Sequence, residues 1–360
     1  MTQLNQSACS SSFLYSIGAI ALCALSTIIG CSGGGPAGDE QSADPATRWI
    51  SDARGRVETT GDGAGRKIVS VSLGNTAVDD DAISGLKSFP DIERLELQQT
   101  SVTGTGLNVL NSLPNLQVLN LEGTAVDDSA VPHLKAMTKL RVLKLTGTKV
   151  TDDGLKELVS LPQLQELWLG GTAVSDLGLS ILSGMKHLKV LSLQGTKATD
   201  EAFGSLAQLT ELRVLNVSNT TITGAGFSHL GQLTALEELD AANAPITDEG
   251  ISHLRPLAKL SSLWLTGTRI TNEGLKMIGE LTSLSEVGLA DTSITDEGME
   301  YLTGLKNLQV LHVKNTGVTL QGASKIKIAI PASFIPPFNM AGNKEAMEAD
   351  AASRSAQKQQ

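Results

Sequence analysis

The sequence predicts an α/β solenoid, in which one short strand and one short helix recur in about eleven 24-residue repeats. Three observations predict it: a threonine recurs every 24 residues, apolar residues stand at fixed offsets from it, and their spacing changes from two to three within each repeat. The repeat origins are Thr76, Thr100, Thr124, Thr148, Thr172, Thr196, Thr220, Ala244, Thr268, Thr292 and Thr316. Only Ala244 departs from threonine, and no insertion interrupts the series.

The residues before each origin predict a strand. Apolar residues stand eight, five and three positions before it. In the repeat of Thr148 these are Leu140, Leu143 and Leu145. The last two are separated by one variable residue, which is the period of a strand with one buried face. We therefore expect one short strand in every repeat.

The residues after each origin predict a short helix. Apolar residues stand two, seven, ten and thirteen positions after it, and a spacing of three is helical. In the repeat of Thr148 these are Val150, Leu155, Leu158 and Leu161. All seven columns are apolar in all eleven repeats. Because neither element can bury its apolar face alone, stacked repeats must form one continuous core.

The link between strand and helix carries a recurring Val-Thr-Asp-x-Gly-Leu motif, as in residues 150–155. Threonine or aspartate at this place caps a helix N-terminus, and the acidic residues that follow suit its positive end. The aspartates of successive repeats can also be read as a ladder of calcium ligands. A cap accounts for them without any further ligand, so we expect capping.

The combined pattern, Leu-x-x-Leu-x-Leu-x-Gly-Thr followed by Val-Thr-Asp-x-Gly-Leu, resembles the leucine-rich repeat family. The resemblance covers about residues 67–330 and is closest to the short ribonuclease-inhibitor-like repeat found in bacterial surface proteins, including lipoproteins. It implies a right-handed horseshoe with its strands on the concave side. Threonine replaces the asparagine or cysteine that is usual at the origin. In the family that side chain bonds the loop backbone of adjacent turns, and we expect the threonine hydroxyl to do the same.

The N-terminal segment, residues 1–31, has the composition of an export signal. Residues 13–30 are apolar, small or hydroxyl-bearing without any charge, and the segment ends in Ile-Ile-Gly-Cys31. That ending resembles a lipobox, which implies that Cys31 is lipidated and becomes the new N-terminus. Residues 1–12 contain no lysine or arginine, unlike most secretory signals. An uncleaved membrane anchor and ordinary signal cleavage therefore stay open as alternatives.

All three alternatives export the rest of the chain. The lipobox resemblance implies a lipid anchor at Cys31 in the cell envelope. Ser32 follows the cysteine, and the absence of aspartate there implies the outer membrane or the cell surface in bacteria with two membranes.

Composition divides the remainder into a tether, two caps and the repeats. Residues 32–45 are rich in Gly, Ser, Pro and Asp and predict a flexible tether. Residues 46–66 are expected to cap the first repeat of the solenoid, 67–330. Residues 331–360 are expected to form a C-terminal cap and a disordered tail, with Ile328 among the apolar residues that close the last repeat.

Charge and cysteine content exclude several classes of function. The chain has 28 Lys and Arg against 38 Asp and Glu, a formal charge of -10, which argues against a nucleic-acid partner. Its three cysteines, Cys9, Cys23 and Cys31, all precede the repeats. The repeats therefore contain neither a disulfide nor a structural zinc site of the Cys/His kind.

No motif points to catalysis. The sequence contains neither a Gly-x-Ser-x-Gly nucleophile turn nor a phosphate-binding Gly-x-x-x-x-Gly-Lys loop. His229 and His253 occupy one column in adjacent repeats and can be read as half of a metal site. No third ligand is forced near them, so we interpret them as solvated histidines of the convex face. We expect no enzymatic activity and no cofactor.

The concave face is the predicted binding surface. Residues six, four and two positions before each origin alternate with the buried residues at minus five and minus three, so they point away from the core. Trp168 and Trp264 both stand in the column at minus four. The predicted contact residues are Trp168, with Val142, Val190 and Glu166 around it, and Trp264 with Asp240.

These observations predict a protein-binding module, or a glycan-binding one, that acts through its concave face. Exposed tryptophan among aliphatic residues is typical of interaction hot spots. Two other interpretations stay open: a structural surface protein without a specific ligand, and an enzyme or enzyme regulator with an unrecognised site.

Overall fold

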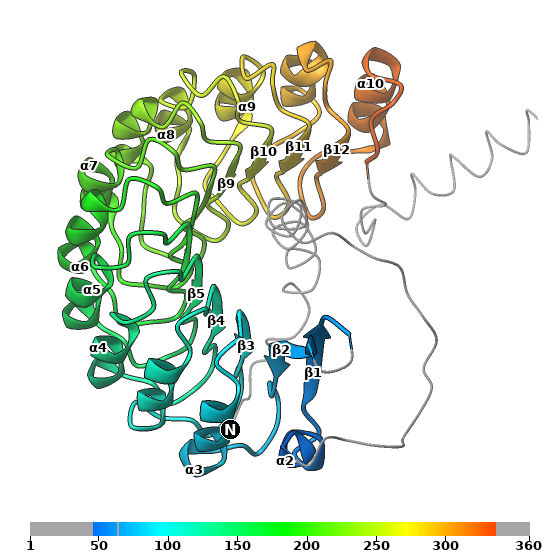
Figure 1. Cartoon of the computed structure of the whole chain (residues 1–360). Helices are drawn as coiled ribbons and strands as arrows, with labels where there is room; N and C mark the ends of the chain where they lie inside the picture. The colour runs from blue at the N-terminus through cyan, green and yellow to red at the C-terminus, as the bar shows by residue number, and fades with distance from the viewer. Residues whose placement is uncertain (1–45, 63–64, 336–360) are drawn as a thin grey trace, which may run out of the picture. The chain divides into compact units, whose positions relative to one another are not determined.

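The computed structural model describes residues 46–62 and 65–335 (Figure 1). The predicted signal with Cys31, the predicted tether 32–45 and most of the predicted tail lie outside the described residues. All repeats belong to the unit Trp49–Gln360.

The strands form one twelve-stranded sheet in chain order, β1 to β12. Strands β2 to β12 are parallel and in register, one per predicted repeat, whereas β1 pairs with β2 in antiparallel fashion. Their bounds are β1 Arg56–Thr60, β2 Lys67–Ser72, β3 Arg94–Glu96, β4 Val118–Asn120, β5 Val142–Lys144, β6 Glu166–Trp168, β7 Val190–Ser192, β8 Val214–Asn216, β9 Glu238–Asp240, β10 Ser262–Trp264, β11 Glu286–Gly288 and β12 Val310–His312.

Short helices follow the strands and cover the outer side of the curved sheet (Figure 1). The α-helices are α2 Arg48–Asp52, α3 Asp80–Ile83, α4 Val131–Leu134, α5 Asp152–Leu158, α6 Asp176–Ile181, α7 Phe203–Leu206, α8 Asp248–Ser252, α9 Asn272–Ile278 and α10 Leu320–Ala329. The 3-10 helices are η2 Ser84–Ser88, η3 Gly106–Ser112, η4 Asp128–Ala130, η5 Leu182–Gly184, η6 Asp200–Ala202, η7 Ala225–Gln232 and η8 Gly298–Gly304. The predicted α/β horseshoe is confirmed.

The predicted apolar columns form the core. Every residue in the seven columns is buried except Ile68 in the first repeat and Ala329 in the last. Phe203 and Phe227 stand in one column of adjacent repeats, and their rings meet edge to face with centroids 5.3 Å apart. Each large aliphatic side chain contributes about 1.5 to 3 kcal/mol of burial free energy before chain entropy is subtracted. The expectation for Ile328 was wrong, because its side chain is 81% exposed.

The origin threonine stabilises the turn that ends each strand. In all ten threonine repeats its hydroxyl donates to the carbonyl three residues earlier, at 2.6 Å from Thr148 to Leu145. The expected bond to an adjacent turn was wrong, because the hydroxyl is held inside its own turn. Backbone groups make the link between repeats, as from the N–H of Gly147 to the carbonyl of Gly170 at 2.7 Å.

The residue before each origin has a left-handed backbone in all eleven repeats, with φ of 68° at Gly147. This conformation explains why the position is limited to residues that tolerate it. They are Asn75, Gln99, Gly123, Gly147, Gly171, Gly195, Asn219, Asn243, Gly267, Asp291 and Asn315.

The repeated aspartates join neighbouring repeats. Thr151 caps α5 by accepting from the N–H of Asp153, as expected of this position. Asp152 instead accepts from the backbone N–H and the hydroxyl of Ser175 in the next repeat, at 2.8 and 2.6 Å. Protein donors therefore reach both carboxylate oxygens. Of the two residues expected to cap this helix, Thr151 does so, whereas Asp152 joins neighbouring repeats.

The repeat of Ala244 lacks the turn hydroxyl, and it also carries the small Ala241 in a core column. We expect the backbone amides of residues 239–246 to exchange faster than the equivalent amides of neighbouring repeats, because about 1 kcal/mol or more of local stabilisation is missing. Hydrogen exchange read by mass spectrometry measures this. Substitution of Ala244→Thr should raise protection there, and equal protection in the unaltered chain would contradict the expectation.

Candidate binding site on the concave face

Each short strand presents two side chains to the concave side. Its middle residue is a core leucine or valine, so the residues on either side point the opposite way. In-register pairing aligns these residues into two rows across the sheet, the first row from the start of each strand and the second row from its end. In the second row Lys144 lies beside Trp168, and Asp240 lies beside Trp264.

The structure corrects the predicted openness of this surface. Val142, Val190, Glu166 and Asp240 are only 3%, 6%, 7% and 2% exposed, although all four were expected to be exposed. Parallel strands stand about 4.8 Å apart, so neighbouring side chains of a row shield one another. Trp168 and Trp264 are partly exposed and remain the large apolar side chains of the second row that a ligand can reach.

Trp168 stands in the middle of the first predicted group. The ammonium nitrogen of Lys144 lies 5.2 Å from its ring centroid, in cation–π geometry. Burial raises the pKa of Glu166, and the positive charge of the Lys144 ammonium opposes that rise. We call Val142, Lys144, Glu166, Trp168 and Val190 the Trp168 patch.

Trp264 is held in place by contacts across three strands. Its indole N–H donates to the hydroxyl of Ser262 at 3.0 Å, and its ring lies against His312 with centroids 5.2 Å apart. Gly288 stands between these two strands in the second row, and a Cβ there would overlap the indole. The glycine therefore lets the ring lie across β11 and reach His312.

Two buried carboxylates lie next to Trp264. Glu238 is fully buried, and neither of its carboxylate oxygens has a hydrogen-bond partner among the described residues. Burial, with Asp240 and Glu286 nearby, raises its pKa to about 7. Burial also raises the pKa of Asp240 to about 6, although the Ala242 N–H and the Ser218 hydroxyl oppose the shift.

His312 lies beside the third carboxylate of this region, with its Nε2 3.7 Å from Glu286 Oε1. We call Glu238, Asp240, Trp264, Glu286 and His312 the acidic–aromatic cluster. Strand β8 lies between it and the Trp168 patch. The structure thus brings the predicted residues together as two groups on one face.

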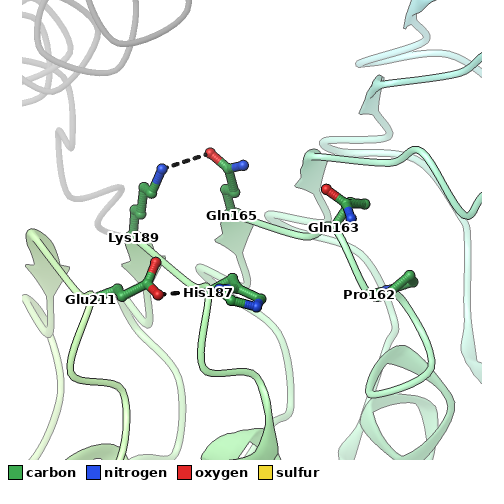
Figure 2. A pocket seen from close by; sticks show the side chains of 6 residues that line it. All are labelled: Pro162, Gln163, Gln165, His187, Lys189 and Glu211. Atoms are coloured by element: carbon green, nitrogen blue, oxygen red, sulfur yellow. Dashed lines mark hydrogen bonds and ion pairs between the residues drawn. The ribbon is translucent and has the colours of Figure 1, made fainter.

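A shallow hollow of about 290 Å³ lies at the start of β6 and β7 (Figure 2). It is lined by Pro162, Gln163, Gln165, His187, Lys189 and Glu211. Figure 2 shows two pairs among its polar side chains: His187 Nδ1 lies 3.1 Å from Glu211 Oε1, and Lys189 Nζ donates to Gln165 Oε1 at 3.1 Å. These groups satisfy each other, so the hollow is a weaker candidate than the two rows.

The histidine column of the convex side stays outside the site. His229 is exposed and His253 is half-buried. Within residues 46–62 and 65–335 no three His, Cys, Asp or Glu side chains gather closely enough to hold a metal ion. In the same part of the chain, no helix combines the length and the apolar composition needed to cross a membrane.

Sequence reasoning did not include Lys144, Gly288 and His312 of the second row among the contact residues, nor Glu238 and Glu286 of the first row, although both columns were visible in the sequence. The partners of these residues were not, because contacts between side chains one or two strands apart depend on ring orientation. A glycine one repeat after a tryptophan in the same column, as at Gly288 and Trp264, is the signal that could have indicated this contact.

Comparison with known proteins agrees with this geometry. A family model described as a leucine-rich repeat region matches residues 124–323. An internalin from Listeria monocytogenes has 21% sequence identity and a TM-score of 0.54, with 82% of this chain and 95% of that chain covered. The mouse RP105/MD-1 complex contains a chain with 20% identity and a TM-score of 0.55, with 73% of this chain and 44% of that chain covered. No curated protein matches the chain.

Proposed function

The chain belongs to the leucine-rich repeat family, and from that premise we propose that it is an exported, membrane-tethered module whose concave face binds a protein. The fold is typical of protein-binding modules. The observation that carries the proposal is the pair of partly exposed tryptophans in the second row, each held by neighbouring side chains.

Large rigid side chains lose little conformational entropy when they bind a partner. Tryptophan is enriched among residues that dominate interface energies, and it performs best where its surroundings are already ordered. Lys144 orders one indole, while Ser262 and His312 order the other. The mouse structure named above is itself a complex of two proteins, which supports the choice of a protein over a glycan.

Affinity capture with the full chain tests this function. The chain is immobilised and exposed to an envelope extract, and retained proteins are purified and measured again in solution. We expect at least one protein to bind saturably and to be displaced by free chain. Retention of a glycan alone would favour the glycan alternative, and no saturable ligand of either kind would favour a structural surface protein.

Replacement of Cys31→Ala tests the proposed anchor, which rests on the Ile-Ile-Gly-Cys31 ending. We expect incorporation of labelled fatty acid into the unaltered chain and none into the variant, because the thiol is the proposed attachment point. Metabolic labelling followed by membrane fractionation measures both. If neither chain is labelled and both stay in the membrane at full length, the segment is an uncleaved anchor instead.

A further inference from the structure

The acidic–aromatic cluster has a chemistry that a generic interaction surface does not require. We propose that it is a subsite for one cationic side chain, lysine or arginine, of a protein partner. This inference rests on the proposed function, because it assigns a chemical class of ligand to part of the same concave face.

Glu238 lacks the kind of partner that Asp152 has. Neither carboxylate oxygen of Glu238 has a hydrogen-bond partner among the described residues, and the side chain is fully buried. By contrast, Asp152 accepts two hydrogen bonds from Ser175. A buried carboxylate is costly unless a donor or a cation compensates it. Glu238 therefore lacks the compensation that a donor or a cation would supply.

The Trp168 patch is a comparable arrangement in which a cation is present. In the Trp168 patch, Glu166 and Trp168 share strand β6, and Lys144 of the preceding strand lies over the indole. In the cluster, the strand before Trp264 carries Glu238 and Asp240 instead of a lysine. Both the Trp168 patch and the acidic–aromatic cluster therefore combine carboxylates with an indole. In the cluster, however, the positive charge has to come from a side chain of the partner.

Among the described residues, the neighbouring strands present no lysine or arginine to Glu238. Strand β8 presents Asn216, strand β10 presents Ser262 and Trp264, and β11 presents Glu286, which lies beside His312. The nearby guanidinium of Arg213 is paired with Glu237, at 3.3 Å. The described surroundings hold no lysine or arginine paired with Glu238 or Asp240.

The degree of burial indicates how the ligand enters. Glu286 and Trp264 are half-buried, whereas Asp240 and Glu238 are buried. A ligand that enters from the surface therefore meets Glu286 and Trp264 before it meets Asp240 and Glu238. A lysine or arginine suits such a path, because its long apolar stem packs on the indole while its charged head reaches inward. Hydrogen bonds from that head would satisfy the free oxygens of Glu238.

Protonation supplies a second readout. The raised pKa values of Glu238 and Asp240, about 7 and about 6, leave both groups partly protonated near neutral pH. A bound cation favours their ionised forms, so binding releases protons. Affinity should therefore increase as the pH rises from about 5 to about 8.

The test uses the full chain and a peptide of alternating glycine and lysine with four lysines, compared with the equivalent glycine–glutamate and glycine–serine peptides. Isothermal titration in buffers of different ionisation enthalpy measures both affinity and proton release. We expect the unaltered chain to bind only the lysine peptide and to release protons as it does so. We expect the double variant Glu238→Gln, Asp240→Asn to bind this peptide at least about tenfold more weakly than the unaltered chain. Glu96→Gln, an acidic residue of the second row in β3, is the matched control.

The subsite would be overturned if the double variant bound the lysine peptide with the same affinity as the unaltered chain. It would also be overturned if the unaltered chain bound the peptide without releasing protons. Absence of any lysine-peptide binding would overturn it too. If the double variant fails to fold, Glu286→Gln replaces it and should show a weaker loss in the same direction. A captured partner that binds the double variant normally but binds Trp168→Ala poorly would remove the subsite and leave the proposed function standing.

Discussion

Truncation of Trp168→Ala is expected to weaken partner binding at least about thirtyfold, which corresponds to roughly 2 kcal/mol. The indole is large, partly exposed and ordered by the Lys144 ammonium 5.2 Å from its centroid. Val142 and Val190 are buried and pair in register with Glu166, so they are not themselves the contact surface. Removing the indole therefore removes most of the apolar surface that this patch offers to a partner.

The control for this variant is His229→Ala, which lies on the convex side and is exposed. Titration of a purified partner against both variants measures the difference. Urea unfolding should show nearly unchanged stability for both, because neither residue belongs to a core column. Equal affinity of the two variants would move the binding site away from the Trp168 patch, to the convex helices or to the ends of the solenoid.

Substitution of Glu238→Gln is expected to raise the free energy of unfolding by about 2 to 3 kcal/mol at pH 8. Glutamine has nearly the same shape but carries no charge, so it avoids the cost of ionising a buried group without a donor. Residues of a binding site are often retained at such a cost to stability.

The sign of the pH dependence follows from the pKa. Because the folded-state pKa of Glu238 is about 7 and its ordinary value is 4.5, the folded chain binds the proton more tightly than the unfolded chain does. The stability that protonation supplies is complete below about pH 4.5 and is lost as the pH rises through 7. The advantage of the variant should therefore be small at pH 4.5 and largest at pH 8.

Urea unfolding of the full chain at both pH values measures this advantage. The control Glu96→Gln, a half-buried acid of the same face, should change stability by no more than about 0.5 kcal/mol. An advantage of Glu238→Gln that is the same at pH 4.5 and pH 8 would show that charge burial is not its cause.

The fold was predictable from the sequence because every repeat carries the same pattern of apolar residues. Eleven copies of seven apolar columns leave one way to bury all of them, and the structure buries all but Ile68 and Ala329. The wrong expectation for Ile328 lies at the end of the solenoid, where no further repeat follows it. Periodicity determines a residue's environment only where neighbours stand on both sides.

The candidate site was predictable only in part. The sequence indicates which residues point to the concave side, so Trp168 and Trp264 could be named. It does not indicate how far neighbouring side chains cover one another, which is why Glu166 and Asp240 were expected to be exposed. That shielding depends on sheet curvature and on the size of residues 24 positions away.

The hydrogen-bond partner of the threonine at each origin was also predicted incorrectly from the sequence. A family resemblance implied that its side chain would join adjacent turns, whereas the hydroxyl of Thr148 bonds Leu145 within its own turn. A hydroxyl has one donor and a short reach, while an asparagine side chain has two donors on a longer stem. The link between repeats is made instead by backbone groups and by the Asp152 type of carboxylate.

The claim that the concave face binds a protein can be tested before the partner is identified. A photoreactive amino acid is placed at Gln194, an exposed residue just beyond β7 on the concave side, or at Lys156, an exposed residue of α5 on the convex side. Irradiation of cells that carry each full-length chain is followed by mass spectrometry of the adducts. If the concave face binds a protein, position 194 gives a protein adduct and position 156 gives none. An adduct from position 156 alone would contradict this claim.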